Sequence, residues 1–524
     1  MRTRFLFFFL LCGLLAKAQT IEVTGFQSGI WKADTVLVTG NIVVQDSLII
    51  APGTTVLFKD FYSIMAEKGA SLKAIGTETD SILFTVADTT GFHLFNLGRG
   101  GWNGIRLTKA GQTRFDYCRF QFGKAALDDD QDGGALRIYG CNDVEISNSK
   151  LFCNFSREHG GALSALQSNV VIHDCAVTDN LAYSFVDTIY FMYGGAMRFH
   201  RCDVTLTDVD FFRNIAEQSI GGAVSLDSCA VHIDRCRFEN NCGMNGAGLY
   251  LIRSNDYKCS ITNSLFANNM SMHFGGGLAI SDSSPEMSNL TVVGNHSVGV
   301  NCGGIFFYQY SSPVVRNCIV YGNTNEVPLQ EPVQMWCWTY ENEVPKFFNC
   351  LIQYGLENIS GNDLIHVYEN NLDTDPLFVD AENADFRLRE GSPCINSGYT
   401  RLDDLSAFDM DGHARVCGGI IDLGAYEFSG TGIGESAQNE QRMRIVGNPV
   451  TASSYAEVEL DQAGNLLASL YSSDGKLLKN RNLGNFQAGT QRIELGELFQ
   501  TLPAGSYLLT VRSADKTFVA KLVK

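Results

Sequence analysis

Apolar and polar residues alternate along most of this chain in short runs with a period of two. Alternation of this kind predicts β-strands that bury one face, and not amphipathic helices. Before Asn241, for example, apolar residues fall at Val231 and Ile233 and again at Cys236 and Phe238. Because Ile233 and Cys236 are three residues apart, the alternation slips by one position between them. The pattern therefore predicts two short strands with a corner between them.

The alternation belongs to an internal repeat with two independent marks. A Gly-Gly-Ala-apolar tetrad begins at Gly133, Gly160, Gly194 and Gly221, with degenerate copies at Gly246, Gly275 and Cys302. An apolar-x-x-Asn mark ends at Asn154, Asn180, Asn214, Asn241, Asn269, Asn295 and Asn323. The tetrads are spaced by 27, 34, 27, 25, 29 and 27 residues and the Asn marks by 26, 34, 27, 28, 26 and 28. Two marks that keep one period predict a solenoid.

Each repeat unit predicts three short strands, two corners and a glycine-rich bend, which together describe one coil of a parallel β-helix. Stacked coils would bury their inner faces in ladders of like residues. After the tetrads, Arg137, Ser164, Arg198, Ser225 and Tyr250 are expected to face outward. The corner positions are mostly Asn or Asp, which tolerate left-handed backbone: Asn148, Asp174, Asp208, Arg235, Asn263, Asn289 and Asn317. A leucine-rich repeat is the rival solenoid, but it needs shorter and more leucine-dense units.

The best copies of the second mark are Phe211 with Asn214, Phe238 with Asn241, and Phe266 with Asn269. Together the two marks resemble the GGA-I and F-x-x-N repeats of chlamydial polymorphic outer-membrane proteins and related right-handed β-helix proteins. The resemblance covers roughly residues 118–355. It implies a right-handed parallel β-helix and says almost nothing about activity.

The expected fold class is all-β, a right-handed parallel β-helix followed by a small C-terminal Ig-like β-sandwich. We expect the β-helix over residues 19–430, with N-terminal coils at 19–110, regular coils at 111–355 and a closing segment at 356–430. The closing segment is expected to cap the open end, which would otherwise expose core and strand edges. Residues 431–442 are polar and unpatterned and predict a linker. The sandwich would occupy residues 443–524.

The sequences at both ends of the chain predict where the protein is located. Residues 1–18 combine a charged start, an apolar run and a small-x-small site, which predicts a signal peptide cleaved between Ala18 and Gln19. No later stretch reaches 18 apolar residues, so no transmembrane span is expected. The C-terminal 80 residues, with Gly447-Asn-Pro449 and a hairpin at residues 473–476, resemble the type A C-terminal sorting domain of the Bacteroidetes type IX secretion system. The resemblance implies secretion and sortase machinery as partners and a secreted or outer-cell-surface location; a generic binding sandwich is the alternative.

The net charge limits the class of partner, and the positions of the cysteines indicate which of them are thiols. The net charge is −18, which argues against a polyanion such as nucleic acid as the partner. Cys175, Cys236 and Cys318 fall on an inward position and are expected to be buried thiols, not bridges. Cys394 and Cys417, in the closing segment, are the candidate disulfide.

Two features are candidate binding sites. Asp128, Asp130 and Asp132 stand on alternate residues before a glycine, which is the spacing of a calcium loop. Position 12 of that loop is Tyr139 and not an acid, so an EF-hand does not fit, and an exposed acidic loop is the alternative. Two departures from the coil plan carry aromatic residues that suit sugar stacking or serve as lids over the solenoid: Tyr190 and Tyr193, and Trp336, Trp338 and Tyr340.

No motif identifies a catalytic residue. His159 precedes repeat glycines, so we expect no active-site signature there. The leading hypothesis is a non-catalytic adhesin or glycan-binding scaffold whose partner is a polysaccharide or a host or cell-surface glycan. A polysaccharide lyase or glycoside hydrolase on the same fold is the alternative, and an inert stalk is the third. An enzyme predicts converging carboxylates and a base over the coils, whereas a binder predicts exposed aromatic side chains.

Overall fold

The computed structural model describes residues 19–524 except positions 95–96, 128–129, 184–193, 300, 327–332, 341–342, 401–405, 417–418, 429–443, 447–449, 452–453, 461, 473–476, 501, 504 and 514–516. Its contacts divide the chain into two units. One comprises Met1–Ala230 with Asn240–Tyr257, and the other comprises Val231–Glu239 with Lys258–Lys524.

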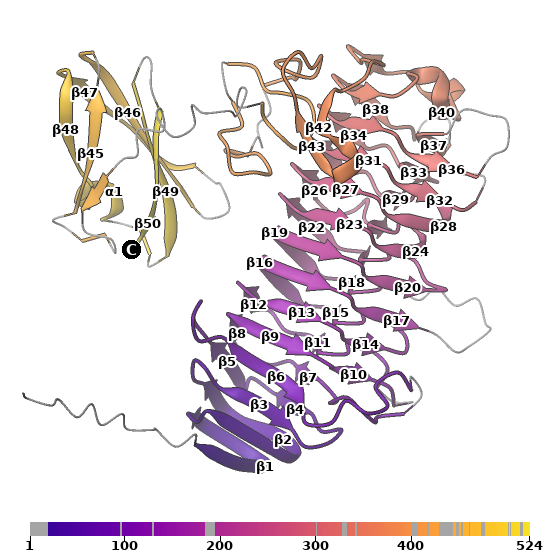
Figure 1. Ribbon diagram of the computed structural model, residues 1–524, viewed down its shortest axis with the longest axis vertical. Coiled ribbons are helices and arrows are strands. Elements are labelled where there is room, and N and C mark those ends of the chain that lie inside the picture. Colours follow the sequence, from indigo (N-terminus) through magenta and orange to yellow (C-terminus); the bar gives the residue numbers. More distant parts are fainter. Residues whose placement is uncertain are drawn as a thin grey trace, which may run out of the picture. The chain divides into compact units, whose positions relative to one another are not determined.

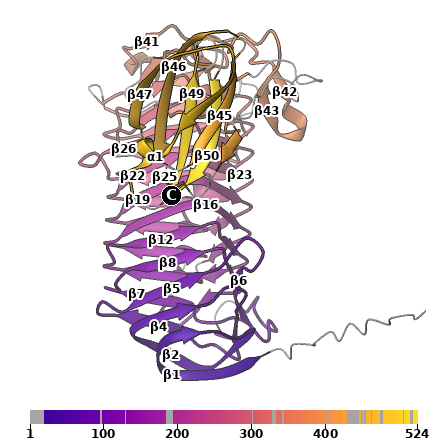
Figure 2. The same ribbon diagram turned by 90° about the vertical axis from the view of Figure 1, so that its left-hand side faces the viewer.

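The first unit is a stack of right-handed coils in which each strand pairs in parallel with its counterparts in the neighbouring coils (Figure 1). It starts with two long strands, β1 (Thr20–Trp31) and β2 (Thr35–Ile50). Face A, which follows the glycine tetrad, contains β4 (Ile64–Glu67), β7 (Ile105–Thr108), β11 (Leu136–Tyr139), β15 (Leu163–Leu166), β18 (Met197–His200), β21 (Val224–Asp227) and β25 (Leu249–Ile252). Figure 2 shows the face B strands β5, β8, β12 and β16 lying one above another.

Faces B, C and D complete each coil of this unit. Face B contains β5 (Ser71–Ile75), β8 (Thr113–Asp116), β12 (Val144–Ser147), β16 (Asn169–Thr178) and β19 (Asp203–Phe212), the last two of which continue onto face C. Face C contains β3 (Thr55–Phe58), β6 (Ile82–Val86), β9 (Cys118–Gln121) and β13 (Lys150–Phe152). Face D contains β10 (Lys124–Ala125), β14 (Phe155–Ser156), β17 (Leu181–Tyr183), β20 (Ile215–Glu217) and β24 (Cys242–Asn245). Face D adds a fourth strand to each coil that the three-strand prediction lacked, because most of its strands in this unit are only two or three residues long.

The second unit repeats the plan. Its face A contains β29 (Leu278–Ser281), β33 (Ile305–Tyr308), β37 (Met335–Trp338) and β40 (Ile359–Ser360), and its face D contains β28 (Met270–Phe274), β32 (His296–Ser297) and β36 (Thr324–Asn325). Its face B contains β22 (Ala230–Asp234), β26 (Cys259–Thr262), β30 (Glu286–Ser288), β34 (Val314–Arg316), β38 (Lys346–Phe348) and β41 (Tyr368–Glu369). Its face C contains β23 (Arg237–Glu239), β27 (Leu265–Ala267), β31 (Thr291–Val293), β35 (Ile319–Tyr321) and β39 (Leu351–Ile352).

The Gly-Gly-Ala-apolar tetrad forms a bend whose first two positions require glycine. The first glycine takes left-handed backbone, with φ of 63° at Gly133 and 61° at Gly160. A Cβ on the second glycine, Gly134, would collide with the carbonyl oxygen of Gly161 in the next coil. The predicted corners are confirmed as well, since all seven have φ between 45° and 56°. These are Asn148, Asp174, Asp208, Arg235, Asn263, Asn289 and Asn317.

The interior consists of the predicted ladders. In the first unit, the side-chain amide of Asn154 donates to Oδ1 of Asn180 at 2.9 Å. In the second unit, Asn295 donates in the same way to Asn323, and Gln334 ends that ladder by accepting from Asn323. The inward cysteines are buried thiols, as predicted for Cys175, Cys236 and Cys318.

The first residues of the closing segment continue the second unit's coils through β40 and β41, and its later described residues lie along the side of those coils, whereas we expected the segment to cap the open end. It contains three 3-10 helices, η1 (Leu356–Asn358), η2 (Asn362–Leu364) and η3 (Ala381–Asn383), and a hairpin of β42 (Phe378–Asp380) and β43 (Asp385–Leu388). Phe378, Phe386 and Leu423 pack against the outward side chains of face C, among them Leu265 and Ile319. Two backbone N–H groups fasten the segment there: that of Gly424 donates to the carbonyl of Asn317 at 2.7 Å, and that of Ala425 donates to Thr291 Oγ1 at 2.9 Å.

The C-terminal residues form two antiparallel sheets around one apolar cluster. One sheet contains β44 (Arg444–Val446), β45 (Tyr455–Leu460) and β48 (Gly489–Glu494), and the other contains β46 (Gly464–Ser472), β47 (Leu477–Phe486), β49 (Ser506–Arg512) and β50 (Thr517–Val523), with the short helix α1 (Gly496–Phe499) between β48 and β49. The linker at 431–442 and the Gly-Asn-Pro and hairpin positions of the sorting-domain resemblance lie outside the described residues. No helix among the described residues is long and apolar enough to cross a membrane.

Candidate functional site

Outward side chains of face A form a polar ladder in the first unit. Strand pairing places Arg106 beside Arg137, Arg137 beside Ser164, and Ser164 beside Arg198 on four successive coils. Ser225 follows in the same register. These residues face away from the core because the buried neighbours in each strand occupy the alternate positions. The ladder brings three arginines to one surface.

Asp130 is held between two of these arginines. Its Oδ2 lies 2.7 Å from Nε of Arg106, and its Oδ1 lies 2.9 Å from Nη1 of Arg137. Arg106 also donates to the carbonyl of Gly133 at 2.8 Å and is almost fully buried. Both oxygens of Asp130 are therefore engaged in ion pairs, and the residue anchors the loop before β11.

Asp132, Glu158 and His159 form a separate cluster at the bend between faces D and A. Their ligating atoms all lie within 4.8 Å of one another. Asp132 directly precedes Gly133 and His159 directly precedes Gly160, so the two occupy equivalent positions of adjacent coils. The backbone holds this register, because the N–H of Gly133 donates to the carbonyl of His159 at 2.8 Å.

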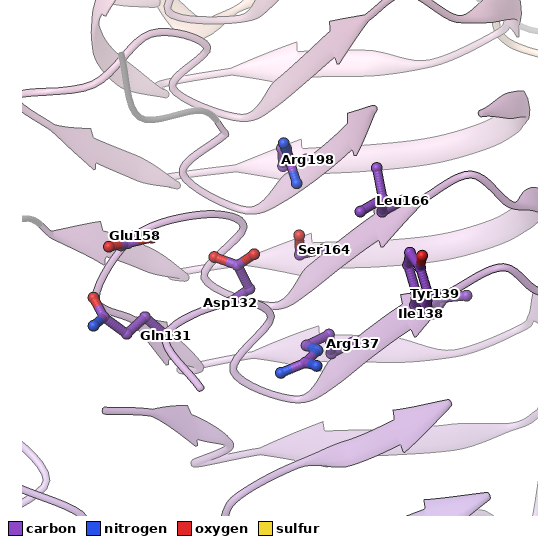
Figure 3. Close-up of a pocket in the computed structure, with 9 residues that line it drawn as sticks. All are labelled: Gln131, Asp132, Arg137, Ile138, Tyr139, Glu158, Ser164, Leu166 and Arg198. Atoms are coloured by element: carbon purple, nitrogen blue, oxygen red, sulfur yellow. The ribbon is translucent and has the colours of Figure 1, made fainter. Parts of the chain in front are cut away.

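A pocket of about 410 Å³ opens between this cluster and the arginine ladder. Figure 3 shows Arg137, Ser164 and Arg198 one above another on successive strands, with Asp132 and Glu158 on the loops beside them. Two buried atoms of the lining side chains, Oδ1 of Asp132 and Nε of Arg198, have no hydrogen-bond partner. Unsatisfied buried polar atoms are costly, so the arrangement suits a polar or charged ligand.

Burial also sets the ionisation of the cluster. It lowers the pKa of His159 to about 4, so the imidazole is neutral at pH 7. Burial, followed by repulsion from Asp132, raises the pKa of Glu158 above its usual value. A neutral imidazole beside two carboxylates can accept a proton or bind a cation.

A second candidate surface lies on face A of the second unit. Pairing of β33 with β37 sets Phe306 beside Trp336 and Tyr308 beside Trp338. The rings of Trp336 and Trp338 are nearly parallel, 15° apart, with centroids separated by 6.0 Å. Trp338 is 54% exposed. Next to the pair, the rings of Tyr310 and Tyr340 lie 4.8 Å apart, and both residues are more than half exposed. Phe306 is itself buried, and we call Tyr308, Tyr310, Trp336, Trp338 and Tyr340 the aromatic platform.

The structure separates the predicted calcium residues. Asp130 is paired with arginines and Asp132 joins Glu158 and His159, so the two do not converge on one point. Asp128 lies outside the described residues, as do Tyr190 and Tyr193 of the first aromatic segment. Trp336 and Trp338 belong to the regular strand β37, which pairs with β33, and not to a loop that leaves the coil.

The remaining predicted positions are at the chain's ends and in the closing segment. Cys394 is a buried thiol there, whereas Cys417 lies outside the described residues, so their disulfide stays a prediction. Gln19 is the first described residue and Ala18 precedes it, so the cleavage site also stays a prediction.

We did not identify Glu158 from the sequence, and we rejected His159 as part of an active-site signature. The signal that identifies them is the repeat register: the residues before the tetrad at Gly133 and Gly160 must stack, which places Asp132 against His159.

Residues 99–295 and 214–372 match the family model described as right handed beta helix region, and together they span just over half of the chain. Among solved structures, the crystal structure of pectate lyase Pel9A is 13% identical and covers 72% of this chain and 88% of its own, with a TM-score of 0.27. That likeness adds nothing to the family match. No curated protein matches the chain significantly.

Proposed function

Because the chain belongs to the right-handed β-helix family, we propose that its coils form a rigid scaffold for glycan binding in a secreted or cell-surface protein of the adhesin class. The fold supplies flat, outward-facing strands on which side chains repeat at regular intervals. Fold alone does not choose a function, so the proposal rests on what the outward face carries.

The observation that carries the proposal is the aromatic platform. Exposed aromatic side chains cost free energy in water, and a contiguous set marks a binding surface. Sugar rings present apolar C–H faces that stack on such rings, whereas their hydroxyl groups need polar partners. Gln309, which donates to the Tyr308 hydroxyl at 2.9 Å, places an amide at the edge of the platform.

Export is the second part of the proposal. The signal peptide at residues 1–18 and the resemblance of the C-terminal 80 residues to a type IX sorting domain both support transport to the outer cell surface. The two antiparallel sheets at the C-terminus are compatible with a compact sorting module. Processing by the sortase would then determine whether the protein stays attached to the cell surface or is released.

The pocket at Asp132 favours a second candidate, a polysaccharide lyase or glycoside hydrolase. Such enzymes need carboxylates and a base close together above the coils. Asp132, Glu158 and Arg198 line one pocket, and His159 lies beside it. The pocket therefore meets the condition that the sequence analysis set for an enzyme.

One experiment separates the two candidates. The full chain is incubated with acidic and neutral polysaccharides, with and without calcium, and its retention on the same immobilised glycans is measured in parallel. New reducing ends and the ultraviolet absorbance of unsaturated uronides report cleavage. Retention without cleavage, abolished by Trp336→Ala and Trp338→Ala but not by Phe26→Ala, supports the binding scaffold; Phe26 is an exposed aromatic residue of β1.

Cleavage that Asp132→Asn or Arg198→Gln abolishes would replace the scaffold proposal by the enzyme. Neither retention nor cleavage of any polymer would refute both and leave the inert stalk.

A further inference from the structure

We propose that Asp132, Glu158 and His159 form a binding site for a divalent transition-metal ion such as Zn²⁺. The inference goes beyond glycan binding and does not depend on it, because the site and the aromatic platform share no residue. It rests on the convergence of three ligating side chains, on their chemical types and on an unsatisfied buried oxygen among them.

The geometry of the three side chains fits an ion. Zn²⁺ bonds nitrogen and carboxylate oxygen at about 2.0–2.2 Å, so ligands at most 4.8 Å apart need to close by only about 1 Å each. The ligands come from the bends of two adjacent coils, and the backbone hydrogen bonds between those bends hold them in place. The N–H of Glu158 donates to the carbonyl of Gln131 at 3.1 Å, and the N–H of Gly133 donates to the carbonyl of His159.

The two carboxylates of the cluster repel each other, and Arg157 and Arg198 offset part of that repulsion. Two carboxylates lie side by side, and Oδ1 of Asp132 is buried without a hydrogen-bond donor. A carboxylate normally accepts several hydrogen bonds, so a buried oxygen without one needs a cation or another donor. This contrasts with Asp130 two residues earlier, whose two oxygens are both paired with arginines. In the same loop, arginines therefore pair with the carboxylate of Asp130, whereas the carboxylate of Asp132 has no such ion pair among the described residues.

The donor set selects the class of metal. Ca²⁺ and Mg²⁺ prefer oxygen ligands alone, whereas an imidazole nitrogen with two carboxylates suits Zn²⁺ and its neighbours. Three protein ligands leave a tetrahedral ion with one open position. Asp132 and Glu158 line the 410 Å³ pocket, and Arg137 and Arg198 line it as well, which favours an anionic group on the open position.

The test uses the metal-stripped full chain and two probes, ZnCl₂ and CoCl₂. Isothermal titration measures the stoichiometry of Zn²⁺, and the visible absorption of bound Co²⁺ reports a nitrogen- and oxygen-ligated site. We expect one equivalent of either ion, retained in an excess of Ca²⁺. Asp132→Asn and His159→Gln should each weaken binding by at least about tenfold, because each removes one of three ligands.

His232→Gln is the matched control, since His232 is exposed and its ring contacts only Ser260 among the contacts that the structure gives it. Circular dichroism of every variant confirms that the coils remain folded. Loss of the metal in the two cluster variants, with binding retained in the control, supports the site.

Three results would overturn the proposal. The first is no binding to the unmodified chain. The second is equal binding by all variants, which places the ion elsewhere. The third is preferential binding of Ca²⁺ that survives His159→Gln, which makes the site an all-oxygen one. Glycan retention is measured separately, so failure here leaves the aromatic platform untouched.

Discussion

The side-chain amide of Asn180 donates a hydrogen bond to Oδ1 of Asn214, 3.0 Å away, in the interior of adjacent coils. The same oxygen accepts from the backbone N–H of Asn180 at 3.1 Å, and the amide of Asn214 donates to the carbonyl of Val177 at 2.8 Å. Both residues are at most 1% exposed. Each asparagine therefore satisfies backbone groups at a corner where strand pairing stops and water does not reach.

Replacing one member of this ladder should unfold coils locally. Asn214→Leu leaves the amide and the backbone N–H of Asn180 without an acceptor, and each buried group without a partner costs about 1–3 kcal/mol. We expect the midpoint of thermal unfolding to fall and the amides of β16 and β19 to exchange faster with deuterium. Asn169→Ala, at an exposed position of β16, should change neither measurement. Equal stability of Asn214→Leu and the unmodified chain would contradict a structural role of the ladder.

Truncating Trp338 should weaken glycan retention without affecting the coils. Because the ring is 54% exposed, Trp338→Ala removes little packing. A lost aromatic contact of about 0.5–1.5 kcal/mol corresponds to roughly two- to tenfold weaker binding. Affinity chromatography on the immobilised glycan that retains the unmodified chain measures the effect, and Trp338→Phe should recover part of it. Full retention by Trp338→Ala would exclude the platform as the binding surface.

His173 should make stability depend on pH. Its Nδ1 lies 2.8 Å from Oδ2 of Asp174 and its Nε2 lies 3.4 Å from Oε1 of Glu145; these two contacts, Asp174 first, raise the pKa of His173 to about 9. The folded state therefore binds this proton more tightly than the unfolded chain, whose histidine has a pKa of 6.5. The stabilisation is complete below about pH 6.5 and disappears as the pH rises through 9.

The histidine contribution should be about 1 kcal/mol, because both carboxylates are more than a third exposed and solvent screens the pairs. Denaturant unfolding of the unmodified chain and of His173→Gln at pH 6 and at pH 9.5 tests this. The two chains should differ at the lower pH and converge at the higher one. A difference that grows with pH would show that the charged form is not the stabilising one.

Removing the buried Arg415 should release the closing segment. The guanidinium is fully buried, its Nε lies 3.4 Å from Oε1 of Glu427, and it donates to the carbonyl of Gly424. Burial already raises the pKa of Glu427 to about 8, so Arg415→Met leaves a buried carboxyl group that takes up a proton, and it leaves the Gly424 carbonyl without its buried donor, which costs about 1–3 kcal/mol. Limited proteolysis should then cut within residues 373–428 while the coils resist. Arg387→Met, whose side chain is 56% exposed, is the control and should leave the segment intact.

The inward thiols should resist modification in the folded chain. Burial raises the pKa of Cys175, Cys302 and Cys394 to about 12, so almost no thiolate forms at pH 8. Alkylation followed by peptide mass spectrometry should label the half-buried Cys153 and Cys242 first. A peptide linking Cys394 to Cys417 would establish the disulfide that the sequence predicts. Rapid labelling of Cys175 in folded protein would contradict its place in the core.

The coils could be predicted from the sequence because a solenoid turns local pattern into global structure. Each corner residue, such as Asn148, has the same neighbours one repeat away, so its conformation follows from the period alone. The same argument would have placed His159 against Asp132. It did not predict Asp130 between Arg106 and Arg137, because Arg106 lies on a coil outside the regular tetrads.

What the repeat could not decide is which outward faces stay exposed. Leu265 and Ile319 occupy the same outward position of face C as Lys150 and Ala176 do in the first unit. Leu265 and Ile319 are nevertheless buried, whereas Lys150 and Ala176 are not. Phe378, Phe386 and Leu423 cover them, and these residues come from a segment without the repeat. The sequence by itself determined the coils, the corners and the inner ladders, because these depend on neighbours at a fixed spacing. Only the tertiary structure decided the cover of face C, because the covering residues belong to a segment that no period relates to the coils. The pocket and the aromatic platform join residues one repeat apart, but how far their side chains stay exposed follows only from the packing around them.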